Sequence, residues 1–222
     1  MIRWEHLDTG AVPGGGELRL MRRGDEVSIM AGAIELMNSR RSGSEIALAE
    51  MTAARIAGRP APRVLIGGLG MGFTLKAARE AFGPKAELVV VELVPAIIAW
   101  ARGPLAHIVG DSLDDPRVKL RQGDVGPAIS EGRGVWDAIL LDVDNGPDAL
   151  TRPANQRLYG RPALAAARDA LRPGGVLAVW SAGPDRAFAG RLREAGFSVD
   201  EVTVRAHGAR KGPRHVIWFA TR

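Results

Sequence analysis

The chain has 222 residues, a formal net charge of +5 and 46% hydrophobic residues. This length suits one substantial hydrophobic core with a small appendage. The lack of cysteine excludes disulfides, zinc-thiolate sites and thiol catalysis. No run of about 18 apolar residues is present, and the first residues, "MIRWEHLDTG", lack the apolar stretch of a signal peptide. We therefore expect a cytoplasmic protein that does not associate with membranes.

The positive charge alone could attract a nucleic acid, so its distribution matters. Basic residues are scattered and are mostly arginine, as in "TRPANQRLYGRPALAAARDALRP", which indicates a coding bias toward arginine. They do not form a stripe that could follow a phosphate backbone. We expect no nucleic-acid partner.

Residues 1–41 show the pattern of a small antiparallel β-domain. The segment "GELRLMRRGDEVSIMAGAIELM" alternates with period two around turn signals at Gly24-Asp25 and Ala31-Gly32. This region is expected to form a unit distinct from the rest of the chain.

Residues 42–222 are predicted to form the second, larger domain. It opens with a helix in "SGSEIALAEMTAARIAG", capped by Ser42 or Ser44 and ending at Gly58. From Arg63 onward, β-rich apolar runs alternate with helical segments, which predicts a doubly wound α/β sheet, mostly parallel. The segment between the last two runs has no helical period, so these runs are expected to pair as an antiparallel hairpin. The seven runs are "RVLIGG", "ELVVVE", "RVKLRQ", "WDAILLD", "GVLAVWSA", "FSVDEVTV" and "HVIWFAT", and the helical segments between them are "FTLKAAREAF", "PAIIAWARGPL", "NQRLYGRPALAAARDAL" and "DRAFAGRLREA".

A glycine-rich loop follows the first of these runs, in "RVLIGGLGMGF". Gly68, Gly70 and Gly72 allow a sharp turn and a close approach of a ligand to the backbone, and the next helix offers free N–H groups. A dinucleotide fingerprint would place its third glycine where Phe73 stands. The loop therefore predicts ligand binding, with a tight turn that binds nothing as the alternative.

Acidic residues stand at the ends of the next strands. Glu92 can accept hydrogen bonds from both hydroxyls of a ribose. Asp124 could accept from an adenine amine while Val125 packs on the ring, or it could simply cap the helix that follows. Asp142 ends the fourth run, and the carboxyl ends of adjacent parallel strands form one crevice. One binding site is predicted there.

The stretch "LLDVDNGPDAL" supplies two candidate catalytic carboxylates, Asp142 and Asp144. Both could instead form the turn before Gly146 and Pro147, because Asp is common in turns. Asp142 ends the buried run and is the stronger candidate.

Other polar and aromatic side chains receive weaker assignments. Arg40 and Arg41 could clamp a carboxylate or lie in a solvated loop. Histidines are assigned no catalytic role, and the tryptophans of the apolar elements are assigned to the core. These residues are His6, His107, His207, His215, Trp100, Trp136, Trp180 and Trp218.

Taken in order, "GGLGMG", Glu92, "GDV" and "ALRPGGVLAVWS" resemble a class I S-adenosylmethionine-dependent transferase, with its Rossmann-like seven-stranded fold. The path from "SEIALAEM" to "QRLYGRPALAAARDALRPGGVL" is similar to the spermidine synthase family. The resemblance implies a homodimer acting on a small-molecule acceptor. A metal site like that of catechol-type methyltransferases would need an Asp-Asn pair where the chain reads "SAGPDRAF", so no metal is expected. The site residues implied are Gly68, Gly70 and Gly72 beside the methionine moiety, Glu92 on ribose, Asp124 near adenine and Asp142 facing the acceptor.

Two departures from the family pattern shape the expected reaction. Gly70 replaces an acid of the glycine loop, and Leu48-Ala49 replaces a Tyr-His pair before Glu50. Fewer acidic and tyrosine side chains weaken recognition of a diamine, whereas Gly70 no longer repels the carboxylate of intact S-adenosylmethionine.

The departures make methyl transfer from S-adenosylmethionine to a small molecule the first expectation, with Asp142 orienting or deprotonating the acceptor. One alternative is polyamine aminopropyl transfer from decarboxylated S-adenosylmethionine, with Asp142 and Asp144 as the surviving acidic pair. A second alternative is a noncatalytic nucleoside-binding protein.

Overall fold

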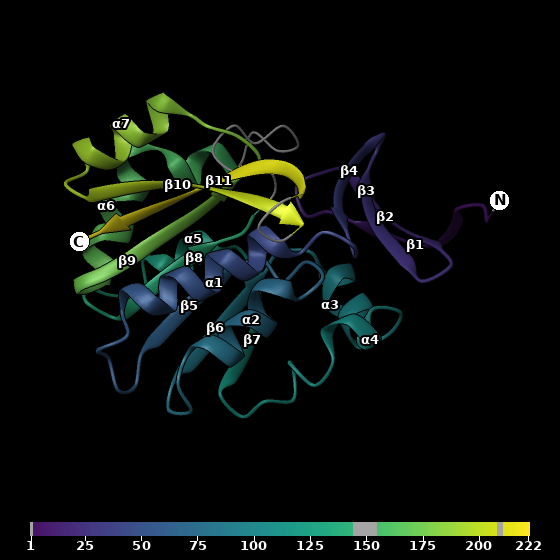
Figure 1. Cartoon of the computed structure of the whole chain (residues 1–222), viewed down its shortest axis with the longest axis horizontal. Coiled ribbons are helices and arrows are strands. Elements are labelled where there is room, and N and C mark those ends of the chain that lie inside the picture. Colours follow the sequence, from purple (N-terminus) through teal and green to yellow (C-terminus); the bar gives the residue numbers. More distant parts are fainter. Residues whose placement is uncertain (1, 144–154, 208–210) are drawn as a thin grey trace.

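The computed structural model describes residues 2–143, 155–207 and 211–222. Its first unit is a four-stranded antiparallel sheet in the order β1-β2-β3-β4, drawn in purple and dark blue in Figure 1. The predicted turn signals join β2 to β3 and β3 to β4, which confirms the antiparallel pattern. The strands are β1(Glu5–Ala11), β2(Glu17–Arg23), β3(Glu26–Ala31) and β4(Ile34–Asn38).

The second unit is a seven-stranded sheet in the order β10-β11-β9-β8-β5-β6-β7. The five strands from β9 to β7 pair in parallel. Strand β11 runs antiparallel to both β9 and β10, so the predicted C-terminal hairpin and the doubly wound sheet are confirmed. The strands are β5(Arg63–Gly67), β6(Glu87–Glu92), β7(Val118–Gln122), β8(Trp136–Leu141), β9(Leu171–Ser181), β10(Ser198–His207) and β11(Lys211–Thr221).

Helices cover both faces of this sheet (Figure 1). Because side chains alternate along a strand, neighbouring residues of β5 enter different cores. Ile66 belongs to a core with Leu48 and Leu75, whereas Leu65 belongs to a core with Leu164. The first face carries α1(Gly43–Arg55), α2(Phe73–Ala81), α3(Pro95–Arg102) and α4(Ala106–Val109), and the second carries α5(Val125–Ile129), η1(Asn155–Tyr159), α6(Arg161–Ala170) and α7(Arg186–Glu194).

The structure differs from the predicted helices in two details. The helix expected across "NQRLYGRPALAAARDAL" is split into the 3-10 helix η1 and α6, because Gly160 has an extended backbone before Pro162. Ser42 occupies the N-cap position of helix α1, one of the two predicted alternatives, but its side chain makes no cap hydrogen bond. The Ser44 hydroxyl bonds the Glu45 side chain.

The small sheet is fastened to the large one through α3. The Trp100 indole Nε1–H donates a 2.7 Å hydrogen bond to Asp8 Oδ2 on β1. Beside it, Gly10 approaches Ala96 so closely that a β-carbon at residue 10 would clash with it. These contacts hold the small sheet near the carboxyl end of β6. None of the helices in the described ranges has the length and apolar character that a membrane crossing requires.

Candidate active site

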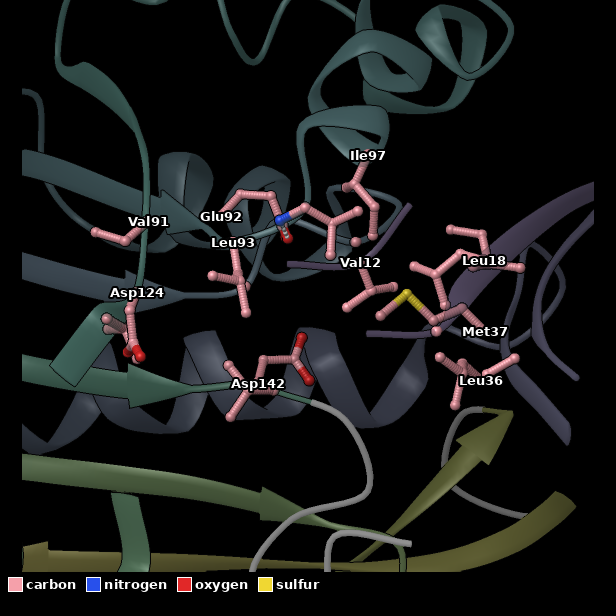
Figure 2. Close-up of a pocket in the computed structure, with 18 of the residues that line it drawn as sticks. Val12, Leu18, Leu36, Met37, Val91, Glu92, Leu93, Ile97, Asp124 and Asp142 are labelled. Carbon is pink, nitrogen blue, oxygen red and sulfur yellow. Dashed lines mark hydrogen bonds between the residues drawn. The ribbon is translucent and has the colours of Figure 1, made fainter. Parts of the chain in front are cut away.

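A cavity lies between the small sheet and the carboxyl ends of the parallel strands (Figure 2). Its volume is about 150 Å³, and it opens to solvent. We call it the central cavity. Its lining includes Gly68, Glu92, Asp124 and Asp142 from the large sheet, and Leu36 and Met37 from β4.

The glycine loop that follows β5 contributes its backbone to this cavity. Gly68 has φ +89°, and a side chain there would collide with the Asp142 carbonyl, so glycine is required by the fold itself. Gly70, with φ +52°, also lines the cavity. Gly72 instead takes the left-handed N-cap position of α2, packed toward Val109, and lies outside the lining of the central cavity.

Glu92 ends β6 and is only 5% exposed. Its Oε2 accepts a 2.8 Å hydrogen bond from the Leu69 N–H, and its Oε1 accepts one of 2.8 Å from the Val94 N–H. Burial raises the pKa of Glu92, and these backbone donors oppose that rise. The carboxylate therefore fastens the glycine loop to the end of β6. Backbone N–H groups thus bind this carboxylate in the free protein, and its contact with a ribose stays a prediction.

Asp124 caps α5, with its Oδ1 accepting a 2.8 Å hydrogen bond from the Gly126 N–H. The capping alternative is thus observed. Asp124 is nevertheless exposed and lines the central cavity together with the buried Val125. Capping and ligand binding are compatible, so the adenine assignment of both residues stays a prediction.

Asp142 is the first residue after β8 and lies between Asp124 on one side and Leu36 and Met37 on the other (Figure 2). Its Oδ2 accepts a 2.6 Å hydrogen bond from the Thr74 hydroxyl. Burial, reinforced by the negative charge of Glu45, raises the pKa of Asp142 to about 7. A carboxyl group with this pKa can exchange protons near neutral pH.

The second catalytic candidate, Asp144, lies outside the described residues, as does its neighbour Asn145. Its predicted role in the reaction is therefore untested.

A second space, which we call the side cavity, adjoins the central one. Its lining includes Glu35, Arg41, Glu45, Asp142, Trp180 and His215. Leu36, Met37, Gly70 and Asp142 line both cavities and so mark their junction. Two adjoining spaces that meet at a carboxyl group could place two substrates in contact.

The charges of the side cavity are not balanced. Arg41 Nη1 lies 3.4 Å from Glu35 Oε2 and compensates that carboxylate. Glu45 Oε2 accepts a 2.6 Å hydrogen bond from the Ser44 hydroxyl, and burial raises the pKa of Glu45. Among the residues that the structure describes, neither Glu45 nor Asp142 forms an ion pair.

The sequence did not single out most of the side cavity. His215 was assigned no site role, yet it lines this cavity. Trp180 belongs to the core, as predicted, and also lines the cavity. Glu45 belongs to "SEIALAEM", but no sequence pattern predicted that its charge would act on Asp142. Arg40, the other arginine considered as a clamp for a carboxylate, forms an ion pair with Glu26, with its Nη1 3.4 Å from Glu26 Oε2.

Within the described ranges, no group of three or more His, Cys, Asp or Glu side chains is arranged to hold a metal ion.

The chain is similar in sequence to polyamine aminopropyltransferases. No family model matches it. It is 32% identical over 123 residues to a polyamine aminopropyltransferase of Korarchaeum cryptofilum, covering 54% of this chain and 36% of that protein. With the Mycobacterium tuberculosis enzyme of the same name it shares 36% identity over 125 residues, covering 51% and 23%. The predicted resemblance to the spermidine synthase-like family is confirmed. The matches thus span less than half the length of these relatives.

The fold agrees with this relationship. The spermidine synthase of Thermotoga maritima superimposes with a TM-score of 0.78 over 97% of this chain and 72% of that one, at 19% identity. At this identity the likeness establishes the shared fold.

The comparisons correct the first expectation about the reaction. Polyamine aminopropyltransferases are stronger matches than Putrescine N-methyltransferase 4 of Nicotiana tabacum, which is 34% identical over 116 residues. Methyl transfer from S-adenosylmethionine is therefore wrong as the leading expectation. The noncatalytic alternative also loses support, since these relatives are named as transferases. The expectation was drawn from the residues missing at Gly70 and Leu48-Ala49, and it took no account of Glu45, which also lines the side cavity.

Proposed function

We propose that this chain transfers an aminopropyl group from decarboxylated S-adenosylmethionine to an amine acceptor. The observation that carries the proposal is the pair of carboxyl groups, Glu45 and Asp142, that line the side cavity and form no ion pair among the described residues. The names of its sequence relatives support the same reaction.

The central cavity suits the donor. Left-handed glycines let the backbone approach a ligand, and apolar side chains from both sheets surround the space. Glu92 would hold the ribose, Asp124 and Val125 the adenine, and Gly68 and Gly70 the chain that carries the sulfonium. Gly72 would support this loop from the start of α2.

The side cavity suits the acceptor. Burying a carboxylate costs free energy unless a cation pairs with it. Arg41 already forms an ion pair with Glu35, so Glu45 and Asp142 are left to pair with a cation of the acceptor. A protonated amine near Glu45 and Asp142 would lower both of their raised pKa values and would itself be stabilised. The same attraction explains how a diamine is recognised without an acid at Gly70.

Asp142 would complete the reaction at the junction of the cavities. An alkylammonium group must lose a proton before its nitrogen can attack, and Asp142 can take that proton because its pKa lies at about 7. When bound, the donor supplies a sulfonium-activated carbon. The amine nitrogen forms the new C–N bond while the C–S bond breaks, and the bonding pair leaves on the sulfur of methylthioadenosine.

Calorimetry with putrescine tests the acceptor site in the presence of saturating methylthioadenosine. Glu45→Gln should weaken putrescine binding by about tenfold or more, because it removes a partly buried charge partner. Glu50→Gln is the matched control, since Glu50 lies exposed on the same helix. Equal putrescine affinity in wild type and Glu45→Gln, or no binding of putrescine or spermidine by the wild type, would contradict the acceptor assignment.

A further inference from the structure

A chain of hydrogen bonds leads from strand β11 to the acidic side of the site. His215 Nδ1 lies 2.9 Å from Ser44 Oγ, and Ser44 Oγ lies 2.6 Å from Glu45 Oε2. Ser44 is completely buried in the first turn of α1. The chain thus joins a carboxylate of the side cavity, through Ser44, to a histidine that stands 171 positions after that serine in the sequence.

Which atom donates in each of these hydrogen bonds depends on the tautomer of His215. A hydroxyl has one proton, and an ionised carboxylate can only accept. If Ser44 donates to Glu45, then His215 Nδ1 must carry a proton and donate to Ser44. If the His215 proton were on Nε2, the Ser44 hydroxyl would donate to Nδ1, and the hydrogen bond from Ser44 to Glu45 would be lost.

The surroundings of His215 favour one ring state and one orientation. Its ring meets the Trp180 ring edge-on, with centroids 4.8 Å apart and planes at 70°. Burial and the positive charge of Arg41 lower the pKa of His215, so the ring is neutral at neutral pH. A neutral ring with the proton on Nδ1 is the form that the hydrogen-bond chain requires.

We propose that His215 is a positioning residue that, through Ser44, holds the Glu45 carboxylate toward the acceptor in the side cavity. The role in holding an acceptor rests on the proposed function, whereas the hydrogen-bond chain stands without it. The other charged groups that share the cavity with Glu45 are Asp142 after β8, Glu35 on β4 and Arg41 in the loop after β4.

A carbon-13 NMR titration of the Glu45 carboxyl group tests the chain without any need for turnover. Ser44→Ala should raise the Glu45 midpoint by about one pH unit, because the ionised form loses its donor. His215→Leu should raise it by a smaller amount. His215→Asn should retain the wild-type midpoint, since the amide nitrogen can donate from the position of Nδ1. Asp142 is followed in the same spectra, because coupled carboxyl groups titrate together.

His107→Asn serves as the matched control, since His107 is exposed on α4, and it should leave the Glu45 midpoint unchanged. An unchanged midpoint in Ser44→Ala, or equal effects of His215→Asn and His215→Leu, would overturn the proposal. So would nitrogen-15 spectra of the wild type that show the His215 proton on Nε2.

Putrescine binding separates this proposal from the proposed function. If the NMR results hold but the wild type binds no putrescine, the acceptor assignment fails while the hydrogen-bond chain stands. If His215→Leu weakens putrescine binding and leaves the Glu45 midpoint unchanged, His215 acts directly on the amine and its positioning role is overturned.

Discussion

The Thr74 hydroxyl donates a 2.6 Å hydrogen bond to Asp142 Oδ2. Thr74 is buried in the first turn of α2, directly after the glycine loop, and Asp142 follows the end of β8. The same loop is fastened to β6 through Glu92. The candidate base and the backbone expected to cradle the donor are therefore held by one connected set of hydrogen bonds.

This contact predicts a shift in the pH dependence of turnover. Because the Thr74 bond lowers the pKa of Asp142 against the effect of burial, Thr74→Val should raise that pKa above about 7. The acidic limb of the kcat/KM profile should move to higher pH. Asp114→Asn, an exposed control, should leave the profile unchanged. A Thr74→Val profile that coincides with the wild type would show that Asp142 is not the group that titrates in turnover.

Removing the carboxylate itself should affect turnover and not donor binding. Asp142→Asn is expected to lower kcat by roughly 10²-fold or more, since a base acts in the transition state. Methylthioadenosine affinity, measured by calorimetry, should stay within about twofold of the wild type. Loss of nucleoside binding would assign Asp142 to the donor and contradict its role toward the acceptor.

The raised pKa of Asp142 also has a consequence for stability. A carboxyl group whose pKa is higher in the folded state than in the unfolded state stabilises the fold below about pH 4, and this contribution is lost as pH rises through about 7. At pH 8, Asp142→Asn should therefore have a higher free energy of unfolding than the wild type, by on the order of 1 to 3 kcal/mol. Urea unfolding measures this difference. The difference should shrink toward pH 4. A variant less stable than the wild type at pH 8 would contradict this expectation.

Glu92 has a larger structural role than its position in the sequence indicates. Glu92→Ala should weaken nucleoside binding and also lower the free energy of unfolding, by roughly 1 to 3 kcal/mol for each buried N–H group left without an acceptor. The affected groups are the N–H groups of Leu69 and Val94. Urea unfolding of the free protein measures the effect, and unchanged stability would show that these two hydrogen bonds contribute little.

The glycine loop and β4 are expected to be coupled. A β-carbon at Gly70 would lie 2.6 Å from Met37 Sδ, and φ is +52° there. Gly70→Asp alone should lower the melting temperature, and adding Met37→Ala should recover part of the loss, because the clash involves a flexible side chain. Additive effects in the double variant would show that the two residues do not interact.

The sequence predicted the parts of the fold that local patterns encode. Period-two segments gave the small sheet, and the alternation of apolar runs with helical segments gave the doubly wound core. The ends of parallel strands placed Glu92, Asp124 and Asp142 around one cavity, because topology brings such ends together.

The side cavity could not be predicted in the same way. Glu45 comes from helix α1 and His215 from an antiparallel strand, and their approach depends on how α1 packs beside β11. No short motif encodes that packing. The absence of an acid at Gly70 therefore does not mean that the site lacks acids, because helix α1 supplies Glu45 through tertiary packing.

Mass analysis of the products distinguishes aminopropyl transfer from methyl transfer. The wild-type protein is incubated with putrescine and equal amounts of S-adenosylmethionine and its decarboxylated form. We expect aminopropyl-putrescine together with methylthioadenosine, and formation of both products roughly 10²-fold or more slowly in Asp142→Asn. Methylated putrescine with S-adenosylhomocysteine, formed by the wild type in place of these products, would contradict the proposed function.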